Sequence, residues 1–285
     1  MKYTVLQVHD LAVIVVNFNQ APYLARCLAS LYVERRQLSL EIIVVDNASS
    51  DDSVNLVSER FPEVKLLVNN ENRGFAKANN QAINITQARY VLLLNNDTEV
   101  LPGSLTELLV FADAHPVAGA VGCMLLRSDG SQHRLPASFF SPLVWLPERT
   151  RRVSWLVGAA LLLKRDALLA VGGLAEEFFF YYEDADLCYR LRNKGWHCYY
   201  CPDARIVHHE KASTSLFRSQ ALYHLYRGRL LLTSRHFPWA YSFVRSWLWL
   251  VFTLDLARAC HGRTASPLLQ VADEIRALLA TDLRC

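Results

Sequence analysis

Several features that define other classes of protein are missing from this chain of 285 residues. Residues 1–10 hold no basic segment followed by a long apolar run, so we expect no secretory signal peptide. The chain has no low-complexity stretch and no repeat of fixed period, which argues against a solenoid. What remains is an ordinary globular composition, with room for one α/β domain and an appendage or for two small domains.

Cysteine chemistry has little support in the sequence. Seven cysteines are scattered among apolar residues, and an odd number placed in this way is typical of reduced thiols in the cytosol. Cys198 and Cys201 have the spacing of a zinc or redox pair, but no second pair exists and the segment alternates like a strand. We therefore expect buried or half-buried thiols.

Two common nucleotide-binding loops are also absent. Arg73-Gly74-Phe75 lies between an expected strand and an expected helix, but the Gly-Lys-Ser/Thr element of a Walker loop is missing. The first expected strand does not lead into Gly-x-Gly-x-x-Gly, which argues against a nicotinamide or flavin cofactor.

Charge is unevenly distributed along the chain. Residues 1–210 carry 20 lysines and arginines against 23 acidic residues, whereas residues 211–285 carry 10 against 4. The basic quarter predicts an anionic partner surface, either phospholipid or nucleic acid. Residues 239–256 are apolar and rich in tryptophan, but the run between Arg245 and Asp255 is shorter than the ~20 residues that span a bilayer, which favours an interfacial helix.

Apolar runs alternate with helical patterns through the first hundred residues. The expected strands are 11–16, 41–45, 64–69 and 90–94, with helices beginning near Pro22, Val54 and Gly74. This alternation predicts βαβ units on a parallel sheet. Further along we expect strands at 117–126, 156–163, 196–200 and 204–207, helices at 187–193 and 222–237, and an irregular segment at 127–154.

Polar side chains follow three of the expected strands at the points where they end: Asn17, Asn19, Asp46, Asn47 and Asp97. Ligands of open α/β sheets bind outside the carboxyl ends of the strands, so we expect these side chains to converge on one crevice. Asp97, preceded by two amides, could hold a hard divalent cation together with substrate phosphates. The alternative is that Asp97 only caps a helix.

Three carboxylates, Glu183, Asp184 and Asp186, lie at the start of an expected helix after a run of aromatic residues. Their mutual repulsion raises the pKa of at least one, which suits a general base. The alternative is favourable charge at a helix N-terminus. His208 and His209 end an expected strand, and strand alternation allows at most one of them to reach the crevice as a ligand.

These pieces together resemble the family-2 glycosyltransferases of the GT-A fold, in particular their bacterial rhamnosyltransferase-like branch. Six stretches match in the family's order and extend over about three quarters of the chain: 13–19, 42–51, 72–80, 92–98, 171–190 and 202–209. The Asp-x-Asp motif of the family reads Asn95-Asn96-Asp97 here, so a single acidic ligand remains.

The resemblance implies a nucleotide-sugar site with these residues: Asn17, Asn19, Asp46, Asn47, Arg73, Gly74, Asn95, Asn96 and Gly158. Asp46 would accept a hydrogen bond from a uracil or thymine ring, and Gly158 would lie near the diphosphate and the acceptor. Asp97 and His208 would hold Mg²⁺ or Mn²⁺. Asp184 would be the catalytic base, supported by Glu183 and Asp186.

The resemblance also implies a GT-A α/β domain over residues 8–212, with a mostly parallel Rossmann-like sheet, and a basic amphipathic helical region over 213–285 that associates with a membrane interface. The expected reaction is an inverting transfer of a sugar, with dTDP-rhamnose as the first candidate donor, to a glycan or polyprenyl-diphosphate-linked acceptor. The expected setting is bacterial surface polysaccharide or lipopolysaccharide synthesis at the inner face of the cell membrane.

Other interpretations stay open at this point. The donor could be a UDP-hexose, a UDP-hexosamine or GDP-mannose, because sugar selection depends on the loop around 127–159. A nucleotidyltransferase has a related fold, but Asn17-Phe18-Asn19 is not its glycine-rich signature. A nucleic-acid-binding protein could use the basic C-terminal region, with tryptophans stacking on bases.

Overall fold

The structure is a computed structural model that describes residues 9–36, 38–136, 143–144, 149–209, 218–261 and 267–283. The expected domain boundary at 212–213 and part of the segment 127–154 lie outside these residues.

The alternation of strands and helices expected over the first hundred residues is confirmed. The elements in chain order are β1 (Leu11–Asn17), α1 (Ala21–Glu34), β2 (Leu40–Asp46), α2 (Ser53–Arg60), β3 (Lys65–Val68), α3 (Phe75–Ile85) and β4 (Tyr90–Asn95). β1 pairs in parallel with both β2 and β4, and β2 pairs in parallel with β3. In this register Asn17 lies beside Asp46, so the polar ends of the strands meet at one edge.

The second half of the sheet is mixed. Its elements are β5 (Thr98–Val100), α4 (Ser104–Ala114), β6 (Ala118–Leu126), β7 (Leu135–Pro136), β8 (Leu143–Val144), β9 (Arg151–Val153), β10 (Ala160–Lys164), α5 (Arg165–Ala170), α6 (Glu183–Asn193) and β11 (His197–His208). The main sheet has nine strands in the order β3-β2-β1-β4-β10-β6-β11-β5, with β9 beside β11. β10 runs antiparallel to β4 and β6, whereas β11 is parallel to β6.

Several expected boundaries differ from the structure. α6 begins at Glu183 rather than 187, the helix expected over 222–237 begins at Arg218, and β9 lies within the segment expected to be irregular. β10 begins at Ala160 rather than 156, because Leu156 instead packs over Gly122 and the backbone N–H of Gly158 turns toward a side chain of α6. β11 is one strand rather than two, with a register shift between Cys201 and Arg205. Pro202 lies in that interval and has no N–H to give to the ladder.

Apolar side chains cover both faces of the sheet. α1, α2 and α4 pack on one face, and α3, α5 and α6 pack on the other. The five cysteines at positions 27, 123, 188, 198 and 201 are buried free thiols, as expected. The two covering layers leave the polar strand ends as the open edge of the α/β domain.

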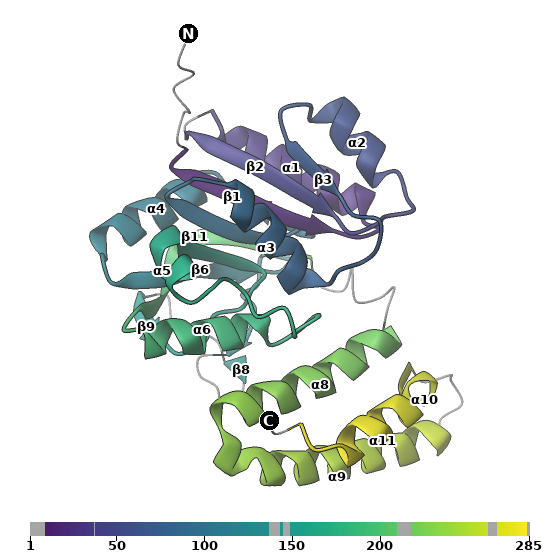
Figure 1. Ribbon diagram of the computed structural model, residues 1–285. Helices are drawn as coiled ribbons and strands as arrows, with labels where there is room; N and C mark the ends of the chain where they lie inside the picture. Colours follow the sequence, from purple (N-terminus) through teal and green to yellow (C-terminus); the bar gives the residue numbers. More distant parts are fainter. Residues whose placement is uncertain are drawn as a thin grey trace.

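The C-terminal helices form a group of their own beneath the α/β domain (Figure 1). They are α8 (Arg218–His236), a 3₁₀ turn (Pro238–Ala240), α9 (Tyr241–His261), α10 (Pro267–Gln270) and α11 (Ala272–Ala280). Tyr226, Leu230, Phe252 and Ile275 lie at the centre of their apolar cluster. None of the helices that the structure describes is long and apolar enough to cross a membrane.

Candidate functional site

The ends of β1, β2 and β4 are joined by side-chain hydrogen bonds. The amide of Asn17 donates to Asp46 Oδ1 (3.0 Å), and the amide of Asn96 donates to Asn17 Oδ1 (2.7 Å). Asp46 also accepts bonds from the backbone N–H and the hydroxyl of Ser49, at 2.8 and 2.6 Å. The expected convergence of strand-end side chains is therefore confirmed for Asn17 and Asp46, and Asp46 orients its neighbours.

Two further predicted residues shape the loops of this edge. Asn19 has a φ of 51° and accepts a hydrogen bond from the backbone N–H of Ser50 at 2.6 Å, which fixes the turn after β2. The amide of Asn47 donates to the carbonyl of Gly74 at 3.2 Å and accepts a bond from Asn69. These bonds bring the loops after β1, β2 and β3 together.

Gly74 permits a close approach that no other residue would allow. Its φ is 79°, and a Cβ at this position would lie 2.6 Å from the carbonyl oxygen of Phe179. The backbone N–H of Phe75 donates to the same oxygen at 2.7 Å. The aromatic segment before α6 is therefore fastened to the loop before α3.

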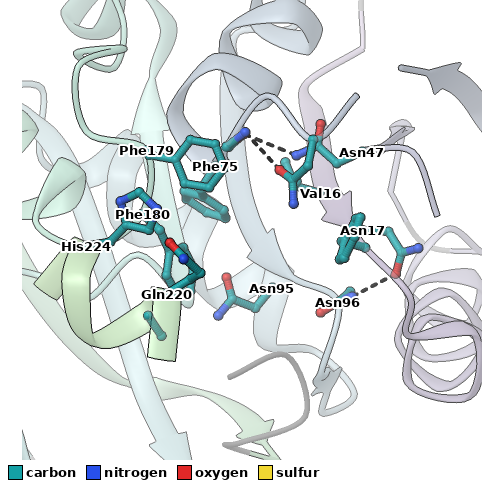
Figure 2. A pocket seen from close by; sticks show the side chains of 14 residues that line it. Val16, Asn17, Asn47, Phe75, Asn95, Asn96, Phe179, Phe180, Gln220 and His224 are labelled. Atoms are coloured by element: carbon teal, nitrogen blue, oxygen red, sulfur yellow. Dashed lines mark hydrogen bonds between the residues drawn. The ribbon is translucent and has the colours of Figure 1, made fainter. Parts of the chain in front are cut away.

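A cavity of about 350 Å³ opens between the strand ends, the aromatic segment and α8 (Figure 2). It is lined by Val16, Asn17, Phe18, Asn47, Asn72, Gly74, Phe75, Asn95, Asn96, Phe179, Phe180, Gln220, Ala221 and His224. Its size is that of a small-molecule pocket. Five predicted residues line it: Asn17, Asn47, Gly74, Asn95 and Asn96.

The other predicted residues do not line it: Asn19, Asp46, Arg73, Asp97, Gly158, Glu183, Asp184, Asp186 and His208. The aromatic run before α6 was noted in the sequence, but none of its residues was assigned to the pocket, which Phe179 and Phe180 line. Gln220 and His224 were missed entirely, because no motif marks them and only the packing of α8 brings them to the strand ends.

Asp97 and His208 lie together where β4 and β11 end. His208 Nε2 is 3.3 Å from Asp97 Oδ1, which is buried and accepts no hydrogen bond from the described residues. His209 faces elsewhere, because its Nε2 lies 2.6 Å from Glu99 and its Nδ1 lies 2.8 Å from Ser128. The alternation expected for the tandem pair is confirmed, and His208 is the member that faces Asp97.

The Asp97–His208 pair fits a partly hydrated cation. The part of the chain that the structure describes contains no group of three or more side chains able to hold a metal. Mg²⁺ commonly keeps several waters and binds through one or two carboxylates together with substrate phosphates. A buried carboxylate oxygen without a donor, beside an imidazole, is consistent with that mode of binding.

Asp184 lies at the start of α6 and does not line the cavity, but it is connected to the cavity wall through the backbone. The backbone N–H groups of Gly158 and Ala185 donate to its two carboxylate oxygens at 2.8 and 2.6 Å. The residue after Gly158, Ala159, accepts a bond at 2.9 Å from the backbone of Asn95, which lines the cavity. Gly158 therefore links the carboxylate to the cavity wall.

Burial raises the pKa of both carboxylates at this helix start. Burial and then the charge of Asp184 raise the pKa of Glu183 to about 8, and Glu183 Oε2 has no hydrogen-bond partner among the described residues. Burial also raises the pKa of Asp184, although the N–H groups of Gly158 and Ala185 oppose it. The repulsion expected from the sequence is present, and the backbone donors favour the negative charge on Asp184.

Asp186 makes a different set of contacts. It is fully buried and bonds to Arg190 Nε and His236 Nε2, both at 2.7 Å, and to Arg235 Nη1 at 3.2 Å. Burial alone would raise its pKa, but the hydrogen bond from His236 and the charge of Arg190 lower the pKa overall. Asp186 does not line the cavity, and it ties α6 to α8.

Comparison with known proteins identifies the family to which this chain is similar. The model of the family described as glycosyl transferase family 2 matches residues 12–168. An N-acetylglucosaminyl-diphospho-decaprenol L-rhamnosyltransferase of Mycobacterium tuberculosis is 30% identical over 264 residues, which span 80% of this chain and 86% of that protein. The O-antigen biosynthesis protein RfbC of Myxococcus xanthus is 30% identical over 70% of this chain, but the match spans only 17% of its own length.

Solved structures share the fold. A mannosyltransferase from Pyrobaculum calidifontis in complex with GDP-Man and Mn²⁺ superposes with a TM-score of 0.57 and 20% identity, over 97% of this chain and 82% of its own. GalNAc-T7 with UDP, GalNAc and Mn²⁺ gives a TM-score of 0.59 at 15% identity, over 70% of this chain and 43% of its own. The expected GT-A fold is therefore confirmed. With the family match and the 30% identity to a relative over most of both chains, these findings show that the chain belongs to glycosyl transferase family 2.

Proposed function

We propose that this enzyme transfers rhamnose from dTDP-rhamnose, with inversion, to a hydroxyl group of a polyprenyl-diphosphate-linked acceptor in bacterial surface polysaccharide synthesis. The observation that carries the proposal is the position of Asp184, a half-buried carboxylate bonded to Gly158 next to the wall of a cavity at the strand ends. The printed name of the mycobacterial relative, a rhamnosyltransferase with a diphospho-decaprenol acceptor, supports the choice of substrates.

The nucleotide would occupy the part of the cavity next to β1, β2 and the loop before α3. Asn17, Asn47 and Gly74 line that part. Asp46 is 1% exposed, and its Oδ2 accepts one hydrogen bond, from the backbone of Ser49. A carboxylate oxygen has two lone pairs, so Oδ2 keeps one for the ring N–H of a uracil or thymine once the base displaces the side chain slightly.

Asp97 and His208 would hold a divalent cation, Mg²⁺ or Mn²⁺, next to the donor diphosphate. Such a cation supplies neutralisation of the charge that develops on a leaving diphosphate. The protein's own contribution is to keep Asp97 Oδ1 buried and free of competing donors among the described residues, and to direct His208 rather than His209 toward it.

Asp184 would take the proton of the acceptor hydroxyl. Its raised pKa brings it nearer to the operating pH, which makes a carboxylate a better base. Glu183, with a pKa of about 8, is mainly protonated at neutral pH and leaves the negative charge to Asp184. The hydroxyl then attacks the anomeric carbon opposite the leaving diphosphate, so the configuration inverts and no protein nucleophile is needed.

The acceptor is proposed to lie in the membrane, and one face of α9 could bind the membrane surface. Exposed apolar side chains recur at helical spacing from the 3₁₀ turn into α9, at Trp239 (79% exposed) in the turn and at Phe243 (75%), Trp247 (41%), Leu250 (57%) and Leu254 (49%) in the helix. Large aromatic and aliphatic side chains on one face are typical of a helix that lies in a lipid interface. We refer to these five residues as the α9 stripe.

The nucleic-acid alternative finds less support. The arginine side chains described in the C-terminal region already have partners. Arg235 pairs with Asp186 and Glu177, Arg245 donates to backbone carbonyls at the end of α11, and Arg229 lies over Trp247. A nucleic-acid groove needs cations that are available to phosphates.

Asp184→Asn tests the proposed reaction. The amide keeps the size of the side chain but cannot accept the proton, so we expect nucleotide binding to persist while sugar transfer falls by about 10²- to 10⁴-fold. Calorimetry with the nucleotide and a transfer assay with product analysis measure the two effects. Asp166→Asn, at an exposed position on α5, is the matched control. Transfer at the wild-type rate by Asp184→Asn, or a product of retained configuration, would contradict the mechanism.

A further inference from the structure

α8 supplies one whole wall of the cavity, although its sequence carries no recognised motif. Gln220, Ala221 and His224 line the cavity from one face of this helix. Figure 2 shows Gln220 and His224 beside Phe179 and Phe180, across the cavity from Asn17 and Asn47. If one end of a ligand is bound at the strand ends, its other end, which points away from β1, would therefore contact α8.

His224 is held in place without using its nitrogen atoms. Its ring stacks on Phe179, with 4.6 Å between centroids and 18° between planes. Phe179 is itself fixed by the hydrogen bond from Phe75. Neither ring nitrogen of His224 has a hydrogen-bond partner among the residues that the structure describes, so the imidazole is oriented by stacking and its polar atoms are available to a ligand.

The polar groups along this part of the cavity suit hydroxyl groups better than phosphates. None of the described lining residues is a lysine or an arginine, which a diphosphate would favour. Burial and then the charge of Arg227 lower the pKa of His224, so the imidazole is neutral at pH 7 and presents one donor and one acceptor. The amide of Gln220 also donates and accepts, which matches a sugar hydroxyl.

We propose that His224, with Gln220 one turn before it, binds hydroxyl groups of the donor's sugar and makes α8 a sugar-selecting element of the active site. This inference rests on the proposed function, because it assumes that a nucleotide sugar occupies the cavity. α8 is then part of the donor site, and the helix that follows it remains a candidate lipid-binding element.

His224→Phe separates the sugar contact from the nucleotide contact. Phenylalanine keeps the stack on Phe179 and removes both ring nitrogens. We expect the Kd of dTDP-rhamnose to rise about tenfold, the usual effect of losing one hydrogen bond, while the Kd of dTDP stays unchanged. Gln220→Met, at an exposed position where folding is not at risk, should weaken the same ligand. Leu225→Ala, exposed and outside the cavity, is the control.

The outcomes distinguish this inference from the function on which it rests. Equal affinity of wild type and both variants for dTDP-rhamnose would overturn the role of α8. Equal weakening of dTDP and dTDP-rhamnose would overturn it too, because the contact would then be to the nucleotide, and a loss confined to acceptor affinity would assign the wall to the acceptor. Failure of the wild type to bind any nucleotide sugar would instead refute the proposed function.

Discussion

Glu183 and Asp184 are adjacent in the chain, but their surroundings give them different protonation behaviour. Asp184 receives two backbone N–H groups, whereas Glu183 Oε2 is buried with no donor among the described residues. Unpaired burial favours the neutral acid, and donors favour the carboxylate. The same short acidic motif therefore holds one carboxylate whose negative charge is favoured by donors and one group that stays protonated at neutral pH.

Glu183→Gln should flatten the dependence of stability on pH. In the unfolded chain Glu183 loses its proton near its ordinary pKa of 4.5, whereas in the folded protein it keeps the proton to about pH 8. Its contribution to stability is complete below pH 4.5 and is lost as pH rises through 8. Between pH 4.5 and 8 the free energy of unfolding of the wild type should therefore fall by up to about 1.4 kcal/mol per pH unit because of Glu183, and this part of the slope should be missing in the variant.

Urea unfolding from pH 5 to 8.5 measures that slope. Glu59→Gln, at an exposed position on α2, should unfold with the wild-type slope. Identical slopes for Glu183→Gln and the wild type would mean that Glu183 ionises normally in the folded protein.

Site residues could be predicted from the sequence where a local pattern determines their position. They could not be predicted where tertiary packing determines it. Asn17 and Asp46 could be predicted because they follow apolar runs and parallel strands align their ends, whereas Asn96 was named only through the family resemblance. The choice between His208 and His209 needed the register of β11 on β5, which spacing alone does not provide. His224 could not be predicted, because nothing in the sequence around it indicates that this part of α8 reaches the cavity.

At the scale of elements, the turn into α6 is strained and depends on its neighbours. Tyr181 and Tyr182 both have a φ of 71°, a conformation that is costly for residues with a Cβ. α8 packs against this turn at Gly228, where an added Cβ would lie 2.8 Å from the carbonyl oxygen of Tyr181. The position of Asp184, two residues beyond Tyr182, therefore depends on how closely α8 approaches.

Gly228→Ala should disturb this arrangement. In an ordinary helix the change stabilises by about 1 kcal/mol. Here we expect it to destabilise by about 1–3 kcal/mol, the usual cost of overpacking, because the methyl group meets backbone. We also expect kcat to fall more than the affinity for nucleotide, since Asp184, the proposed base, moves while the pocket at β1 does not. Thermal unfolding and steady-state kinetics measure both, and a stabilised variant with normal kcat would show that α8 does not hold the turn.

Long helices and strands with a clear local pattern could be predicted from the sequence, whereas short ones could not. β1 to β4 were correct in type and order because each is an apolar run bounded by polar residues. β5, with three residues, and α5, with six, are too short to show a period. The antiparallel direction of β10 could not be predicted, because it depends on the chain returning between β4 and β6.

At the scale of the whole molecule, the cavity and the α9 stripe lie on two connected parts of one chain. α8 lines the cavity and packs against α9, and Arg229 of α8 lies over Trp247 of the stripe. A lipid-linked acceptor bound near the stripe would therefore be close to the helix that forms the cavity wall. This arrangement suits an enzyme whose donor is dissolved and whose acceptor is in a membrane.

The double variant Trp239→Ser, Phe243→Ser should bind lipid poorly. Burying a large apolar side chain contributes roughly 1.5–3 kcal/mol, so we expect the affinity for vesicles of anionic phospholipid to fall at least tenfold. Vesicle sedimentation measures it, with Val110→Ser, an exposed apolar residue on α4, as the control. Equal sedimentation of the double variant and the wild type would show that the α9 stripe does not bind lipid.

Nucleotide binding most directly tests the proposal that the strand-end cavity is the donor site. Thermal unfolding would be followed with dTDP, UDP, GDP, CMP and NADH, each with Mn²⁺ or with a chelator, in the wild type and in Asp97→Asn. A ligand at 100 times its Kd adds about 2.7 kcal/mol to the stability of the folded state. We predict a stabilisation by dTDP or UDP that requires Mn²⁺ and is lost in Asp97→Asn. Stabilisation by GDP alone would replace the proposed donor, and no stabilisation by any nucleotide would contradict the account of the site.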